Sequence, residues 1–72
     1  MKVSISSREL EILRKSADGL SVQQIADEMK VSQQQITKSQ KEIMVKTGSG
    51  NVLNALQNLA KKGFVLTEDK PF

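Results

Sequence analysis

The sequence predicts an all-α fold, a compact four-helix domain with a central helix-turn-helix and a C-terminal dimerisation helix. Apolar residues recur at helical spacing, serines precede these runs with Glu or Gln three residues later, and glycines follow them. A chain of 72 residues without cysteine is expected to form a single domain, residues 1–72. At this size a domain buries only roughly 60% of its unfolded surface. The ordered core is expected at about residues 5–66, followed by a mobile polar tail at 67–72.

The first helix is expected to begin after Ser6. Glu9 stands three residues later, so that each side chain can bond the backbone N–H of the other in a capping box. Gly19 is expected to end the helix in the left-handed conformation, and the segment 1–5 before it is expected to be a loose entry. The apolar residues at helical spacing are Leu10, Ile12, Leu13 and Ala17.

Two further capping boxes follow closely, at Ser21 with Gln24 and at Ser32 with Gln35. Because only a few residues separate the two helices that they begin, these helices are expected to form a helix-turn-helix. The later helix is expected to extend towards Lys46 or Thr47, where glycines at 48 and 50 disfavour its continuation. Its inward stripe is expected to be Ile36, Ile43 and, less strictly, Met44.

The opposite face of this third helix carries polar side chains at Gln34, Thr37, Lys38 and Lys41. Lys can donate to guanine or phosphate, and Gln can pair with adenine, so this face suits a recognition helix that contacts DNA bases. The alternative is an ordinary solvated face, and spacing alone does not decide between the two. The candidate phosphate contacts are residues at the helix starts and one lysine, namely Ser21, Ser32, Gln33 and Lys46. For the two serines, the alternative is that they only cap their helices.

The fourth helix, between Asn51 and Gly63, has more apolar residues than one buried face needs. The surplus predicts a homodimer interface, since a two-fold pair presents two recognition helices one DNA turn apart. Alternatively, the stretch 64–66 folds back over this helix, or pairs briefly with another segment. The expected interface residues are Val52, Leu53, Leu56, Leu59 and Ala60.

Composition excludes several classes of function. The chain lacks His and Cys and shows no nucleophile–base pair, so we expect no metal site, no cofactor and no enzymatic activity. Two Phe and no Trp or Tyr argue against single-strand binders that stack bases on aromatic side chains. A net charge of +3 permits nucleic-acid binding without requiring it. Without a membrane-length apolar run or a signal-peptide core, a cytoplasmic protein is expected.

From about Ser4 to Leu59 the chain resembles the LuxR/GerE-type DNA-binding domain, and its length resembles the small stand-alone GerE-like transcription regulators of bacterial type. The matching residues, in order, are Ile5–Leu13, Gly19–Ser21, Ile25, Ala26, Val31, Ser32, Ile36 and Lys46. The resemblance implies a four-helix domain whose third helix enters the major groove of double-stranded DNA and whose fourth helix dimerises.

The resemblance also implies roles for single residues. Among hallmark family positions, it implies that Glu9 caps and braces, that Leu13 lies in the core and that Gly19 stops the first helix. The family's DNA-contacting positions are Thr37, Lys38 and Lys41. The chain departs from the family pattern, which usually has lysine, histidine and leucine, at Thr37, Ser39 and Thr47.

Two alternatives to a homodimeric DNA-binding regulator remain at this point. A protein-interaction module, acting as an anti-activator or as the heterodimer partner of another regulator, would retain the helices and lose specific DNA contact. A module like region 4 of sigma factors would also bind DNA, and RNA polymerase or another regulator is a possible further partner. Binding through several phosphates weakens steeply with salt, whereas an apolar protein contact does not.

Overall fold

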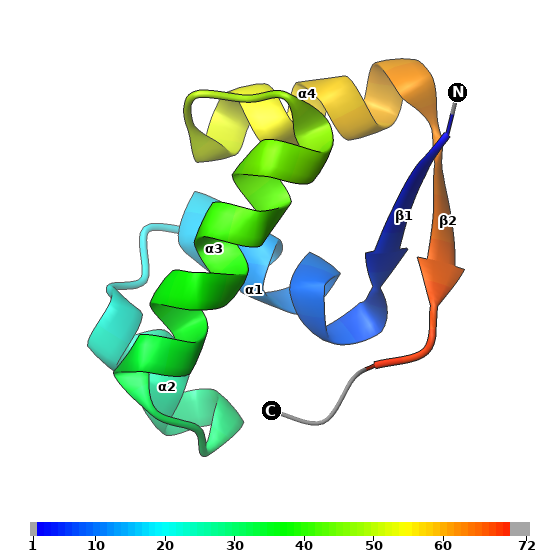
Figure 1. Ribbon diagram of the computed structural model, residues 1–72. Helices are drawn as coiled ribbons and strands as arrows, with labels where there is room; N and C mark the ends of the chain where they lie inside the picture. Colours follow the sequence, from blue (N-terminus) through cyan, green and yellow to red (C-terminus); the bar gives the residue numbers. More distant parts are fainter. Residues whose placement is uncertain (1, 70–72) are drawn as a thin grey trace.

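The computed structural model describes residues 2–69, which form four helices and two short strands (Figure 1). In chain order the elements are β1 (Val3–Ser6), α1 (Ser7–Ala17), α2 (Val22–Met29), α3 (Gln33–Thr47), α4 (Val52–Lys62) and β2 (Phe64–Thr67). The predicted all-α class with a central helix-turn-helix is confirmed, and a small parallel sheet is added to it. The mobility expected for 67–72 falls in part on residues 70–72, which lie outside the described residues.

Each of the first three helices begins at its predicted capping box. Each serine has an extended backbone, its hydroxyl accepts from the N–H three residues later, and its own N–H donates to the side chain there. The reciprocal bonds are 3.0, 2.8 and 3.2 Å long in chain order. At the fourth helix, the Asn51 side chain accepts from Asn54 N at 2.8 Å. The boxes are Ser6 with Glu9, Ser21 with Gln24, and Ser32 with Gln35.

The turn of the helix-turn-helix consists of Lys30, Val31 and Ser32. Lys30 ends α2 in the left-handed conformation, at φ 59° and ψ 45°. Val31 N then donates to Ala26 O at 3.0 Å, and the half-buried Val31 side chain packs against the core. The turn therefore closes by a left-handed residue that is not glycine.

Replacing Lys30 by glycine is expected to stabilise the protein by about 0.5–1 kcal/mol. Left-handed backbone costs an L-residue roughly 1–2 kcal/mol, and the larger chain entropy of glycine when unfolded offsets part of that gain. Urea unfolding measures the difference. Lys30→Ala is the control, because it removes the same charge and retains the backbone cost. A glycine variant no more stable than the alanine variant would contradict this account of the turn.

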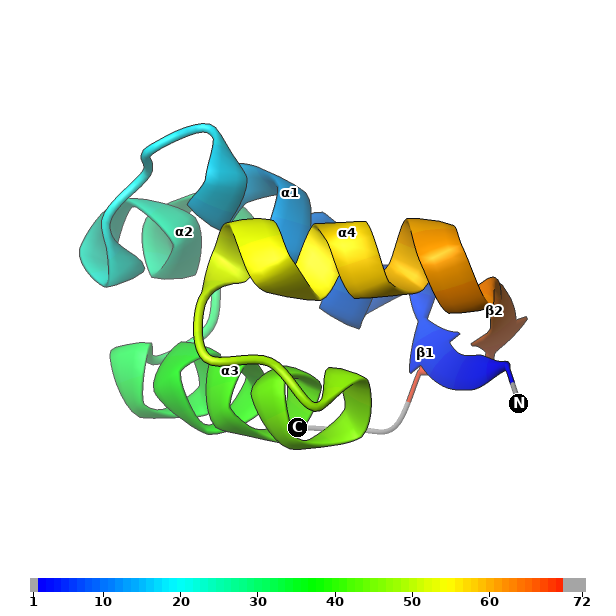
Figure 2. The same cartoon turned by 90° about the horizontal axis from the view of Figure 1, so that it is seen from above.

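The core lies between the four helices and β1. α4 packs on both α1 and α3, and Figure 1 and Figure 2 together show that it lies across the C-terminal end of α3. α3 faces the core with the predicted Ile36 and Ile43, and also with Ser39 and Thr47, whereas Met44 is only half-buried. The buried apolar residues are Ile5, Ile12, Leu13, Ile25, Ala26, Ile36, Ile43, Ala55 and Leu59.

The prediction that Ala17 faces the core is wrong. Ala17 is exposed, because it is the last residue of α1 and the chain turns away there. Leu20 N donates back to Lys15 O at 3.2 Å, and Leu20 packs against the core beyond the helix end. The position of Leu20 between the helix end and the next cap already indicated that it would pack back in this way, whereas the helical spacing at Ala17 did not predict its exposure.

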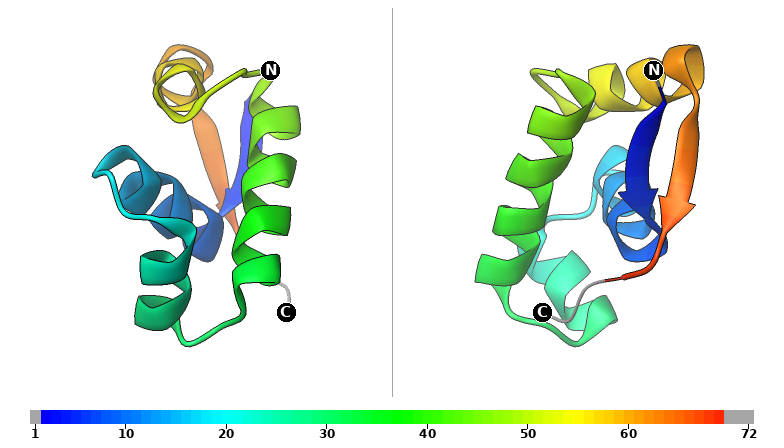
Figure 3. Two further views of the ribbon diagram at one scale, coloured as in Figure 1. Left: turned by 90° about the vertical axis from the view of Figure 1, so that its left-hand side faces the viewer. Right: turned by 45° about the vertical axis from the view of Figure 1, so that its right-hand side comes forward.

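The expected loose entry at 1–5 is also wrong for its described residues. β1 begins at Val3, and Ile5 is fully buried in the core. β1 pairs in parallel with β2, in the register that sets Val3 beside Phe64 and Ser6 beside Thr67. The stretch 64–66 thus pairs with another segment, one of the two predicted alternatives. Figure 3 shows the two strands side by side, with β2 on the outer side.

Candidate nucleic-acid interface

The outer face of α3 is the candidate recognition surface. All four predicted base-contacting residues are exposed and lie on the side of the helix opposite its buried stripe. In Figure 1 this helix faces the viewer, and no labelled element crosses in front of it. The structure therefore brings two lysines, an amide and a hydroxyl to one open helix face. These residues are Gln34, Thr37, Lys38 and Lys41.

Val45 belongs to the same face and was missed from the sequence. Its side chain is 81% exposed, the most exposed large apolar residue in the described part of the chain. Val45 follows Lys41 by four residues, so it lies one turn further along the same face. The helical spacing already contained this signal. An apolar side chain there can contact the methyl group of thymine.

The candidate phosphate contacts at the helix starts are exposed, and they also serve as caps. The hydroxyls of Ser21 and Ser32 accept from Gln24 N and Gln35 N, each at 3.2 Å. Accepting this bond leaves the hydroxyl proton of each serine able to donate to another oxygen. Gln33, the first residue of α3, is exposed beside the Ser32 cap. Capping and phosphate contact are therefore compatible at these positions.

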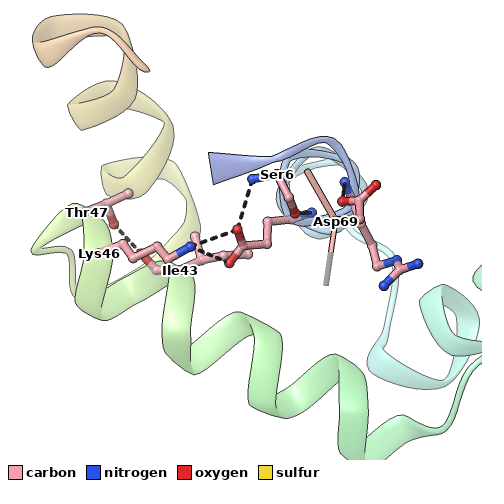
Figure 4. Close-up of polar contacts among 7 residues, drawn as sticks. Ser6, Ile43, Lys46, Thr47 and Asp69 are labelled. Atoms are coloured by element: carbon pink, nitrogen blue, oxygen red, sulfur yellow. Dashed lines mark hydrogen bonds and ion pairs between the residues drawn. The ribbon is translucent and has the colours of Figure 1, made fainter. Parts of the chain in front are cut away.

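Lys46, the remaining phosphate candidate, forms an ion pair with Glu9 (Figure 4). Lys46 Nζ lies 2.9 and 3.0 Å from the two Glu9 carboxylate oxygens, and Glu9 Oε1 also accepts from Ser6 N at 3.0 Å. The Glu9 side chain is 13% exposed and that of Lys46 40%. Glu9 thus ties the end of α3 to the start of α1, and it neutralises the charge of Lys46.

The environment of Glu9 favours its charged form. Burial alone would raise the pKa of Glu9, but the hydrogen bonds and charge of Lys46, with the bonds from Ser6, outweigh burial and lower the pKa below 4.5. A carboxyl whose pKa is lower in the folded state stabilises that state above its unfolded pKa. This stabilisation is lost as pH falls through the folded pKa.

Glu9→Gln is expected to remove this pH dependence. The wild-type free energy of unfolding should fall as pH drops below about 4.5, and the variant should lack the part of the fall due to Glu9. At neutral pH the variant should be less stable by about 0.5–1 kcal/mol, because its amide oxygen can still cap Ser6 but cannot pair with the Lys46 charge. Urea unfolding between pH 3 and 7 measures both effects. If the free energy of unfolding changed with pH in the same way in both proteins, the result would contradict the ion pair.

Comparison with known families identifies the chain's family. The GerE family, the bacterial regulatory proteins of the luxR family, matches residues 3–58. The chain belongs to this family. The match runs from β1 into α4 and includes the whole helix-turn-helix. The chain therefore has the helix-turn-helix domain of a family of DNA-binding transcription regulators. No curated protein matches the chain in sequence.

Of the three residues at which the chain departs from the GerE family pattern, one is exposed on the outer face of α3 and two are buried. Thr37 is exposed on the outer face of α3, so it alone changes the surface that would meet DNA. Ser39 is 9% exposed and Thr47 is fully buried. Those two substitutions therefore alter packing beneath the helix rather than the candidate contact surface.

Thr47 belongs to a polar network that joins the end of α3 to α4. Its hydroxyl donates to Ile43 O at 2.8 Å (Figure 4). Asn58 Nδ2 donates to Thr47 O and to Ser49 Oγ, both at 2.9 Å, and the hydroxyls of Ser49 and Thr47 lie 2.8 Å apart. The network holds the C-terminal end of α3 against α4, and no sequence pattern had indicated it.

A groove of about 660 Å³ lies between α3, the start of α1 and the end of β2. Because its charges have both signs, the groove does not by itself select an anionic ligand. Its charged lining residues are Arg8, Glu9, Lys38, Lys41, Glu42, Lys46 and Glu68.

Residues 2–69 contain neither a cluster of metal-ligand side chains nor a helix suited to a membrane. In that part of the chain, no three His, Cys, Asp or Glu side chains gather as they would around a metal ion. None of its helices has both the length and the apolar character to cross a membrane.

Proposed function

We propose that this protein regulates transcription by binding a specific double-stranded DNA sequence as a homodimer, with α3 in the major groove and without catalytic activity. The observation that carries the proposal is the exposed face of α3, where lysine, amide, hydroxyl and apolar side chains line one side of a helix whose other side is locked into the core. Membership of the GerE family and a net charge of +3 support it.

The side chains on this face can make different kinds of base contact. Gln34 can pair with adenine, while Lys38 and Lys41 can donate to guanine or to phosphate oxygens. Thr37, where the family usually has lysine, offers a hydroxyl and a methyl group in place of a charge. Val45 can contact a thymine methyl group. We therefore expect the preferred site to differ from that of relatives that have lysine at the position of Thr37.

Phosphate contacts would fix the position of α3 on the duplex. The exposed starts of α2 and α3 offer hydroxyl and backbone donors near the positive helix ends, at Ser21, Ser32 and Gln33. Lys46 can add a contact from the other end of α3. Its contribution is expected to be smaller than that of Lys38 or Lys41, because Glu9 neutralises its charge.

The homodimer would form through α4, with Leu53 at its centre. Leu53 is 67% exposed although it is a large apolar residue, and Ala60 is exposed on the same helix. Val52 and Leu56 are half-buried against the core and can contribute their outer edges. Leu59 is 2% exposed, so it supports the helix from within. RNA polymerase or another regulator remains a candidate partner for the assembled dimer.

Selection of bound duplexes from a random pool at physiological salt tests the proposal. A two-fold symmetric site should be enriched, and affinity for it should fall steeply with salt because bound phosphates release their counterions. Enrichment of no sequence, together with binding that salt does not weaken, would overturn the proposal. That outcome would favour the protein-interaction module, whose contacts are apolar.

A further inference from the structure

The outer edge of β2 is open to solvent within the described residues. β2 is one strand of a two-stranded sheet, and its large apolar side chains Phe64, Val65 and Leu66 are 38, 49 and 55% exposed. An open edge presents backbone N–H and C=O groups that another strand can pair with. Proteins protect such edges with lysine, proline or a bulge, and Phe64–Thr67 contains neither lysine nor proline.

The register of the sheet shows which backbone groups face outward. Val3 N donates to Gly63 O at 3.2 Å, so Gly63 directs its carbonyl towards β1. Alternate residues of a strand direct their backbone groups to the same side. Val65 therefore also faces β1, while Phe64 and Leu66 direct their N–H and C=O groups to the open edge.

We propose that the open edge of β2 pairs in antiparallel order with the same edge of a second copy of this chain. The two sheets would join into one sheet of four strands, centred on Val65 of each copy. Phe64 of one copy would then lie opposite Leu66 of the other, and their outward backbone groups would bond each other. A sheet of three or more strands is stable where two strands alone are marginal.

Charges at the ends of the strand favour a second copy as the occupant. Lys62 immediately precedes Gly63 and β2, Glu68 immediately follows it, and both are exposed. Lys62 is the last residue of α4 and not part of the strand, but an antiparallel pair brings the start of each strand, next to Lys62, close to the end of the other, next to Glu68. A parallel pair would set like charges opposite each other, which is destabilising. The residues that flank the strand are therefore complementary in charge to those of a second copy in the antiparallel direction only.

The edge is held in place before any partner arrives. Val3 fixes the start of the strand through Gly63, and beyond its end Asp69 Oδ1 accepts from Arg8 N at 2.8 Å (Figure 4). This bond at the start of α1 lowers the pKa of Asp69, so its carboxylate stays charged near neutral pH. A strand anchored at both ends loses less conformational entropy on pairing than a free one.

This contact is separate from the α4 dimer proposed above. Leu53 lies in the first turn of α4, whereas β2 follows its last residue, roughly 15 Å further on at 1.5 Å per residue. All of β2 also lies outside the part of the chain that matches the family, because the match ends at residue 58. Two separate two-fold contacts would join dimers end to end into larger assemblies.

A charge exchange tests the pairing in the Leu53→Lys background, where the α4 contact is removed. Sedimentation equilibrium should find dimers of this variant. Adding Lys62→Glu should raise the dimer dissociation constant at least tenfold, and adding Glu68→Lys as well should restore it. The matched control Lys30→Glu, which makes the same change of charge in the turn after α2, should leave the dimer intact. Circular dichroism verifies that every variant stays folded.

Leu66→Pro adds a test of the backbone contact. It removes an N–H that faces the open edge, while the residues on either side that face β1 retain theirs. Loss of the dimer is expected. A folded but monomeric Leu53→Lys protein, or a double charge exchange that fails to restore the dimer, would overturn the pairing. DNA binding is measured separately, so either result leaves the proposed function to be judged independently.

Discussion

Replacing Lys38 and Lys41 together by alanine is expected to weaken duplex binding at least a hundredfold without loss of helicity. Both side chains are exposed on the outer face of α3, and among residues 2–69 neither forms an ion pair such as the one that engages Lys46. A contact to a base or phosphate contributes about 1–3 kcal/mol, and 1.4 kcal/mol corresponds to tenfold in affinity. Fluorescence anisotropy with the selected duplex measures the loss.

The matched control is Arg14→Ala with Lys61→Ala, which removes two positive charges from exposed residues of α1 and α4. It should weaken binding only slightly. For the α3 variant, the slope of the logarithm of affinity against the logarithm of salt concentration should also become shallower. The slope should change by about one for each phosphate-bound lysine removed. Equal losses in both double variants would mean that overall charge, and not the face of α3, determines affinity.

Leu53→Lys is expected to break the α4 contact that places two recognition helices one DNA turn apart, while leaving each domain folded. Affinity for a duplex with two half-sites should fall roughly a hundredfold, because linked binding events gain at least that much over single ones. Affinity for a single half-site should stay unchanged. Anisotropy with the two duplexes measures both. Equal losses on both duplexes would contradict a role for Leu53 in dimerisation.

Leu59→Ala on the same helix provides the contrast. Leu59 is 2% exposed, so its truncation leaves a cavity and should cost about 2–5 kcal/mol of unfolding free energy. Leu53→Ala should cost little, since that side chain is 67% exposed. Urea unfolding of the two variants therefore separates the residue that holds the fold from the residue that is free to meet a partner.

Local patterns were sufficient to predict the helices. The three capping boxes each involve residues three positions apart, so the sequence shows both partners of each contact without knowledge of the tertiary fold. The α3 face was predictable for the same reason, because helical spacing alone determines which side chains share a face. The prediction failed at Ala17, where the helical spacing was followed to the last residue of α1 and the side chain is exposed.

Contacts between distant parts of the chain could not be predicted in this way. β1 and β2 are four-residue strands separated by some sixty positions, and short apolar runs at chain ends do not specify a partner. Lys46 and Glu9 are 37 residues apart, so a lysine that looked available for phosphate was found in an ion pair. The network of Thr47 and Asn58 depends equally on how α3 and α4 cross.

The anchoring of α3 at its C-terminal end has a thermodynamic consequence. The Glu9–Lys46 pair and the Thr47–Asn58 bond fix the last turn, while the Ser32 box fixes the first. A recognition helix that is already ordered gives up little conformational freedom when it enters the groove. Calorimetry should therefore find a heat-capacity change of binding no larger than the value expected from the surface that a rigid interface buries. The additional heat-capacity change that is typical of folding coupled to binding should be absent.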